Sequence, residues 1–231
     1  MIKLRIFPLE NDIEFNEDYI NILEIEDKKM FAQFIYSLNR LINYNEESEE
    51  IILLEGNKRL SISKDVMLIH DLFNVDVNES KILKALHLDI ENQYRQEYSE
   101  VNLLEKFSDV IQNINDIVAS YDFEFEYKRE ITIKELLKTI NFKFDSNYYD
   151  NPFDNIMCIF DLVSTFKLYK LIVVVNAKCY FKEEELVEIY KAAKYRNINL
   201  LIIEPIVDIN LKYLENKLSI DNDYDEFILK M

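Results

Sequence analysis

The alternation of hydrophobic and polar positions predicts a mixed fold for the first third of the chain. Four short extended runs have the apolar content of strands: 2–7, 20–25, 51–54 and 60–62. The last two runs flank Glu55-Gly56-Asn57, the kind of turn that closes a hairpin. Between the runs, residues 27–43 carry apolar side chains at helical spacing.

The middle of the chain is predicted to be helical. Apolar stripes indicate two long amphipathic helices over residues 78–96 and 99–121, which we expect to pack as an elongated hairpin. Thr132 and Glu135 have the spacing of a capping box, which predicts a short helix to about residue 141. Residues 142–144 are predicted to return as a strand.

Helices and strands are predicted to alternate in the last third of the chain. Residues 154–169 and 183–195 are predicted helices, and the continuous apolar runs 171–175 and 200–203 are typical of buried strands. This order predicts a βαβ unit with a parallel sheet. We therefore expect an α/β head built from residues 1–74 and 151–231, with a helical leg inserted over residues 75–150.

Composition limits which class of protein, cellular compartment and binding partner the sequence is compatible with. An apolar content of 49% excludes a disordered chain. Cys158 and Cys179 lie among apolar residues, which predicts reduced core thiols in a cytoplasmic protein, and no segment has the pattern of a signal peptide or a membrane span. The formal charge of −17 argues against a nucleic-acid partner, although bulk charge does not describe any one surface.

Catalytic and nucleotide-binding patterns are absent from the sequence. The turn after residue 175 contains no glycine, and Glu183, Glu184 and Glu185 follow it, where they would repel phosphate. This pattern suits a degenerate nucleotide-hydrolase-like head that has lost its phosphate loop. His70 and His87 have apolar neighbours and are predicted to be hydrogen-bonded structural histidines. We therefore expect a binding protein and no enzyme.

An acidic segment is the first candidate site. If residues 121–127 form a strand, Asp122, Glu124 and Glu126 share one face, where they could bind a hard cation such as calcium. The same three residues could serve a metal-dependent nuclease or phosphoesterase, which is the alternative function. On the residues alone, a solvated strand face backed by aromatic side chains is favoured over either site.

Basic side chains form the second candidate site. Lys134 and Lys138 lie four residues apart on the short capped helix, opposite its apolar side chains. Two further pairs could contact DNA phosphates: Lys58 with Arg59, and Lys128 with Arg129. A basic stripe is more often the wet face of a helix, so the residues alone favour that interpretation.

Six stretches of the chain resemble the short form of the Csn-two (Csn2) family of type II-A CRISPR spacer-acquisition proteins, in a match that spans roughly residues 50–205 in the right order and spacing. They are DLFNVDVN (71–78), ILK (82–84), LDIENQY (88–94), EITIKELLK (130–138), LIVVVN (171–176) and LLIIEP (200–205). The resemblance implies a homotetrameric ring, held by calcium ions, that threads onto free ends of double-stranded DNA without sequence preference or hydrolysis. It also implies the adaptation integrase and the effector nuclease as partners. A ring would reconcile DNA with the acidic charge, because its lumen can be basic while its outer surface stays acidic.

Overall fold

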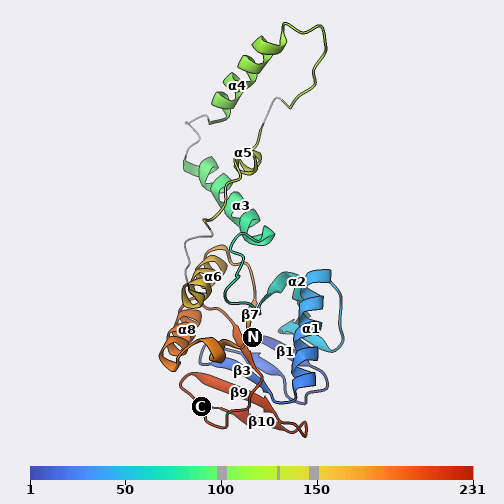
Figure 1. Ribbon diagram of the computed structural model, residues 1–231, viewed down its shortest axis with the longest axis vertical. Coiled ribbons are helices and arrows are strands. Elements are labelled where there is room, and N and C mark those ends of the chain that lie inside the picture. The colour runs from blue at the N-terminus through green and yellow to red at the C-terminus, as the bar shows by residue number, and fades with distance from the viewer. Residues whose placement is uncertain (98–102, 129–130, 146–150, 231) are drawn as a thin grey trace. The chain divides into compact units, whose positions relative to one another are not determined.

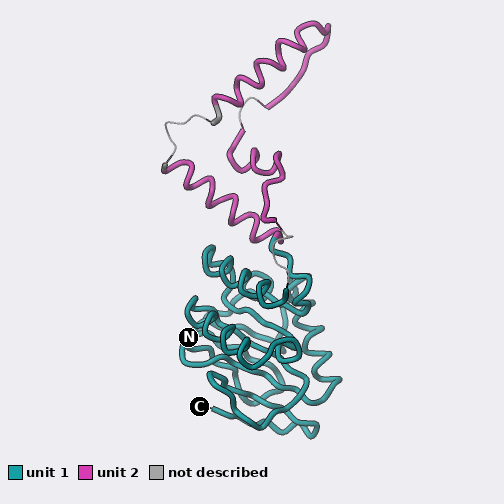
Figure 2. The backbone as a smooth tube through the Cα atoms, turned by 60° about the vertical axis from the view of Figure 1, so that its left-hand side comes forward, with its two compact units in different colours: residues 1–77, 147–231 teal, residues 78–146 magenta. Residues whose placement is uncertain are grey.

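The computed structural model describes residues 1–97, 103–128, 131–145 and 151–230 (Figure 1). The chain divides into two compact units, which Figure 2 shows in two colours. Met1–Val77 and Asn147–Met231 form the first unit, here called the head; Asn78–Ser146 forms the second, here called the leg. The boundaries expected from the sequence, 74/75 and 150/151, lie three and four residues away.

Two sheets build the head. The larger sheet has the strand order β10-β9-β3-β8-β7-β6, and all neighbours in it are parallel except β10 with β9. Its strands are β3 (Ile20–Ile25), β6 (Val66–Ile69), β7 (Leu171–Val175), β8 (Leu200–Glu204), β9 (Glu215–Ile220) and β10 (Glu226–Leu229). The antiparallel smaller sheet, in the order β2-β1-β4-β5, contains β1 (Ile2–Ile6), β2 (Ile13–Phe15), β4 (Ile51–Glu55) and β5 (Lys58–Arg59). The predicted α/β class and the parallel pairing of β7 with β8 are confirmed.

Helices cover both faces of the larger sheet (Figures 1 and 2). α1 (Lys28–Tyr44) begins at Asp27, whose carboxylate accepts from the amide of Met30 at 2.7 Å, and buries Phe34, Leu38 and Leu41 in the core shared with the smaller sheet. α6 (Pro152–Phe166) and α8 (Glu183–Tyr195) pack together on the other face. Two four-residue helices complete the head: α2 (Ile62–Asp65) and α7 (Ala177–Tyr180). The predicted strand over 60–62 is wrong, since Ile62 begins α2.

The described part of the leg contains three helices: α3 (Ser80–Glu97), α4 (Leu103–Val118) and α5 (Ile133–Thr139). The predicted capping box at Thr132 and Glu135 is confirmed. Among the described residues α3 packs against α5 and lacks an extended contact with α4, so the expected hairpin of two long helices is wrong.

Side-chain hydrogen bonds hold residues 142–144 against α3. Asn78 both donates to the carbonyl oxygen of Phe144 and accepts from its amide, each at 2.9 Å. The Nε2 atom of His87 lies 2.9 Å from the carbonyl oxygen of Phe142. The segment is irregular, so the predicted strand is wrong, because side chains satisfy its backbone where a strand would use a neighbouring strand.

The structure tests the expected environments of the two histidines and the two cysteines. His87 is buried and hydrogen-bonded, as predicted, whereas His70 is exposed. Cys158 is half-buried and Cys179 is exposed, so the prediction of a core thiol is wrong for Cys179. Cys179 lies on the four-residue α7, at the end of the sheet, where solvent reaches it. Among the described residues, no helix has the length and apolar content needed to cross a membrane.

A buried network of charged side chains ties β3, β8 and β9 together. The ammonium of Lys217, which has no exposed surface, lies 3.2 Å from a Glu24 oxygen and 3.5 Å from a Glu215 oxygen. It also donates to the carbonyl oxygens of Asp208 and Asn210, at 2.9 and 2.7 Å. These bonds fix the middle of the loop that connects β8 to β9.

Lys178 and Glu204 complete this network from α7 and β8. The Lys178 ammonium lies 3.0 Å from Glu215, and the Lys178 amide donates to Glu204 at 2.7 Å. Burial raises the pKa of Glu204 to about 7. The neighbouring carboxylates of Glu24 and Glu215 also raise this pKa, whereas Lys178 lowers it. When Glu204 is protonated, it adds no further negative charge to the carboxylates beside Lys178 and Lys217.

This network predicts a pH-dependent stability. In the unfolded chain Glu204 ionises near 4.5, so between pH 4.5 and 7 the folded state holds a proton that the unfolded state has lost. The free energy of unfolding should therefore fall as pH rises through this window, by up to about 3 kcal/mol from this group, and level off above it. Glu204→Gln should remove this slope in urea unfolding followed by circular dichroism.

Glu188→Gln is the matched control, since Glu188 lies exposed on α8. It should keep the slope of the unaltered protein. An equal slope in the protein and in Glu204→Gln would show that Glu204 does not carry the dependence.

Candidate nucleic-acid interface

Charge is unevenly distributed within the leg. Residues 78–88 and 131–144 contain five lysines and two carboxylates, whereas the other leg residues contain four basic and twelve acidic side chains. We call these five lysines the basic surface: Lys81, Lys84, Lys134, Lys138 and Lys143. A local excess of positive charge is what phosphate binding requires, even in an acidic chain.

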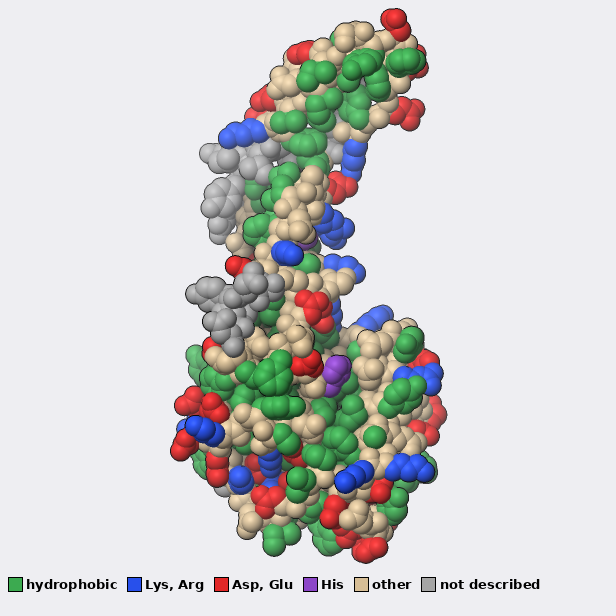
Figure 3. All heavy atoms as spheres, in the orientation of Figure 1, with side chains coloured by type: hydrophobic (Ala, Val, Ile, Leu, Met, Phe, Trp, Pro, Cys, Tyr) green, Lys and Arg blue, Asp and Glu red, His purple; other side chains and the backbone are tan. Residues whose placement is uncertain are grey.

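The packing of the leg brings these lysines together. α3 carries Lys81 and Lys84, and it packs against α5, which carries Lys134 and Lys138. Lys143 lies beside α3 as well, because both of its neighbours are hydrogen-bonded there. Phe142 is bonded to a side chain of α3, and Phe144 to Asn78 just before α3. In the view of Figure 3, basic side chains gather along one edge of the leg at the level of α3 and α5.

Most of the basic surface is available to a ligand. Lys84, Lys138 and Lys143 are exposed, and Lys134 is half-buried. Throughout the described part of the chain, no carboxylate forms an ion pair with these four lysines. Their positive charge is therefore uncompensated at short range, as for side chains that bind phosphate oxygens.

The other predicted basic residues have different environments. Lys128 forms an ion pair with Glu135 at 2.6 Å, and this contact, with the Thr132 cap, lowers the pKa of Glu135 to about 2. Arg129 lies outside the described residues. Lys58 and Arg59 belong to the head: both are exposed on β5, and Arg59 pairs with Glu49 at 3.1 Å. Lys128 is therefore neutralised by a carboxylate of α5, whereas Lys58 and Arg59 belong to a different unit from the five lysines.

The acidic segment is not a strand. Residues 121–127 form bends and irregular backbone, and the side chains of Asp122, Glu124 and Glu126 are exposed. The predicted division into an acidic and an aromatic face fails because, among the described residues, no strand pairs with the segment. Within the described residues, no group of three His, Cys, Asp or Glu side chains could hold a metal ion. The three carboxylates of one chain thus do not fit a preformed calcium or nuclease site.

Sequence reasoning missed Lys81, Lys84 and Lys143. Counting charges segment by segment would have found them, because the lysine-rich segments flank an acidic stretch of the leg. Lys143 is not evident in the sequence because the pattern of residues 142–144 predicts a strand. Only the hydrogen bonds of Asn78 and His87 relate Lys143 to α3.

The carboxyl edge of the larger sheet, where open α/β sheets bind nucleotides, is filled by the protein itself. β7 is followed by Asn176, which has a left-handed backbone (φ 59°), and α7 begins at the next residue. The amide of Lys178 points to the Glu204 carboxyl group, which lies where a phosphate would accept such a donor. The Lys178 ammonium is held by Glu215 and Glu24.

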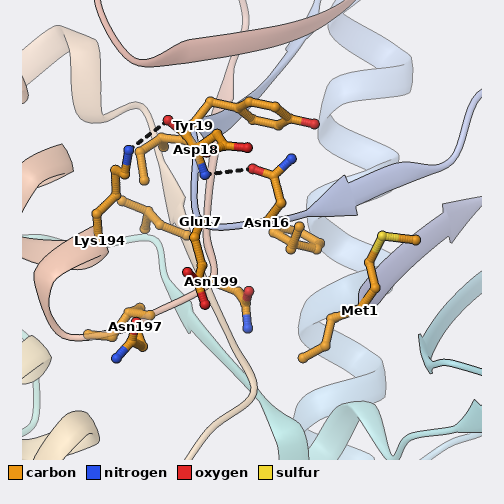
Figure 4. Close-up of a pocket in the computed structure, with 13 residues that line it drawn as sticks. Met1, Asn16, Glu17, Asp18, Tyr19, Lys194, Asn197 and Asn199 are labelled. Atoms are coloured by element: carbon orange, nitrogen blue, oxygen red, sulfur yellow. Dashed lines mark hydrogen bonds between the residues drawn. The ribbon is translucent and has the colours of Figure 1, made fainter.

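A pocket of about 580 Å³ opens at the opposite, amino ends of β3 and β8 (Figure 4). Its lysine, Lys194, donates to the carbonyl oxygen of Asp18 at 2.7 Å, and the amide of Asp18 donates to the side chain of Asn16 at 2.9 Å. Glu17 and Asp18 add negative charge to the lining. This pocket therefore does not suit an anionic ligand.

Comparison with known proteins supports the family expected from the sequence. The chain is 26% identical over 210 residues to the CRISPR-associated protein Csn2 of Streptococcus agalactiae, covering 89% of this chain and 90% of the relative. The CRISPR-associated protein Csn2 of Enterococcus faecalis is 24% identical over 197 residues, covering 85% of this chain and 86% of the relative.

A solved structure has the same fold. Stu0660 of Streptococcus thermophilus superposes with a TM-score of 0.56 at 16% identity, covering 99% of this chain and 76% of the other. The family model described as CRISPR-associated protein (Cas_Csn2) matches residues 43–224, well over half of the chain. This protein belongs to the Csn2 family of CRISPR-associated proteins.

Proposed function

We propose that the chain is a non-enzymatic CRISPR adaptation protein that forms a homotetrameric ring around free ends of double-stranded DNA. The observation that carries this proposal is the basic surface, a local excess of lysine in a chain of formal charge −17. An acidic exterior disfavours nonspecific binding to DNA from outside. Enclosure would let a few lysine–phosphate contacts suffice, because a threaded ring dissociates only by sliding off an end.

An uncovered apolar stripe on α4 supports the assembly part of the proposal. Val110, Ile114 and Ile117 share one side of the helix and are 51%, 48% and 67% exposed. An amphipathic helix gains most of its stability from burying such a stripe. A second copy of the chain would bury it and its equivalent together, as in most symmetric oligomers.

Calcium and the protein partners remain part of the proposal through the family resemblance. Because Asp122, Glu124 and Glu126 form no ligand set within one chain, calcium bound there would need ligands from a second subunit. The adaptation integrase and the effector nuclease are the proposed partners.

The ring model predicts a preference for DNA ends. A linear duplex should bind the protein, whereas a sealed circle of the same sequence should bind much more weakly, because a closed ring has no end to enter. Titrations with and without calcium, read by gel shift, measure both affinities. Equal affinity for sealed circles contradicts threading. DNA cleavage with magnesium that Glu124→Gln abolishes contradicts the non-enzymatic proposal.

The basic surface predicts which lysines matter for DNA. Lys84→Glu, Lys138→Glu and Lys143→Glu should each weaken binding to a linear duplex about five- to tenfold at low salt. Each substitution is present in all four subunits, so it should also reduce the slope of log affinity against log salt by about one for every subunit whose lysine contacts the DNA.

The matched control is Lys106→Glu, because Lys106 is exposed in the acidic part of the leg and its reversal changes the net charge equally. Its affinity should change less than twofold. If all four variants lost affinity equally, net charge alone would explain the result, and the basic surface would not be the DNA site.

The α4 stripe predicts a change in assembly. Ile114→Asp should reduce the particle mass from that of four chains to that of a smaller species in light scattering, because it places charge in the buried contact. Gln112→Asp, on the polar side of the same helix, should leave the mass unchanged. An unchanged mass for Ile114→Asp would exclude this stripe as a subunit contact.

A further inference from the structure

β10 forms one edge of the six-stranded sheet. Within the described residues its backbone pairs with β9 alone, from Glu226 opposite Ile220 to Leu229 opposite Lys217. Its outer side therefore presents N–H and C=O groups that no described strand of the same chain pairs with. Proteins usually protect such an edge or use it to pair with another chain.

Large apolar side chains are exposed on both faces of this strand. Phe227 is 49% exposed and Ile228 is 43% exposed, and as successive residues of a strand they point to opposite faces. The strand is held in place, because the carboxylate of Glu226 accepts from the amides of Glu10 and Asn11 at 2.7 and 3.1 Å. A rigid edge loses little conformational entropy when it pairs.

The residue order is complementary to itself. In Glu226-Phe227-Ile228-Leu229-Lys230, an acid and a base lie at equal distances on either side of Ile228. If two such strands run antiparallel with Ile228 opposite Ile228, Glu226 of one faces Lys230 of the other, and Phe227 faces Leu229. Each copy then supplies one oppositely charged pair and one apolar pair, both of which stabilise antiparallel strands.

Charge also favours this segment as a contact. Two copies of a chain with charge −17 repel each other, so contacts form most readily where the charge is locally balanced. Residues 226–230 carry one acid and one base and are neutral overall.

We propose that β10 pairs with β10 of a second copy, antiparallel and with Ile228 on the two-fold axis, so that two six-stranded sheets become one of twelve. The inference rests on the proposed ring and deepens it. The α4 stripe and the β10 edge would give each subunit two self-complementary contacts, one in the leg and one in the head. Two such contacts are enough to close a ring of four with dihedral symmetry.

Cysteine cross-linking tests the register directly. Residues directly opposite on antiparallel strands have Cα atoms about 4.5–5.5 Å apart, within disulfide range, whereas a two-residue offset gives about 7–8 Å. Ile228→Cys should therefore form a covalent dimer under mild oxidation, in the full chain with Cys158→Ser and Cys179→Ser. Phe227→Cys, on the same strand with similar exposure, is the matched control and should cross-link at least tenfold more slowly.

Particle mass provides the second measurement. Lys230→Glu places a like charge opposite each Glu226 and should halve the mass in light scattering, while Lys191→Glu on the exposed side of α8 should not change it. A tetramer in which Ile228→Cys fails to cross-link overturns the β10 contact but leaves the ring. A dimer that cross-links through Ile228→Cys supports the β10 contact and overturns the ring, and a monomer overturns both.

Discussion

The ion pairs of the buried Lys217 ammonium are the interaction on which the architecture of the head depends. Lys217 has no exposed surface, so its charge is tolerated only because Glu24 and Glu215 lie beside it and two loop carbonyl oxygens accept hydrogen bonds from it. These partners come from β3, from β9 and from the connection that precedes β9. The same group of charges engages α7 through Lys178, so the carboxyl edge of the sheet is closed by the protein's own side chains.

The carboxyl edge of the larger sheet is filled by side chains of the head, so the candidate DNA-binding surface is in the leg. The head has an excess of acidic over basic residues, whereas the uncompensated positive charge of the leg is concentrated on α3, α5 and Lys143. At physiological ionic strength exposed charges are screened beyond about 8 Å, so lysines in a cluster act on a nearby phosphate largely independently of distant carboxylates. An overall charge of −17 is therefore compatible with a DNA-binding surface.

Local signals in the sequence were sufficient for some elements. The continuous apolar runs of β7 and β8 and the Thr132–Glu135 cap predicted those elements correctly, because each signal lies within the element itself. β9 was missed because Glu215, Lys217 and Ser219 give it polar residues at buried positions, which only partners distant in sequence can satisfy. Residues 121–127 have the alternation of a strand but no neighbouring strand, and Lys143 joins the candidate site only through Asn78 and His87. What depended on tertiary partners could not be predicted.

The central position of β3 also has a consequence for synthesis of the chain. Ile22 pairs with Ile202, 180 residues later, and with Lys217, so β3 leaves the ribosome long before either neighbouring strand exists. The helices of the leg make contacts over much shorter separations and can form while the head is incomplete. A nascent chain would therefore carry a formed leg and an unpaired, apolar β3, the kind of intermediate that chaperones protect.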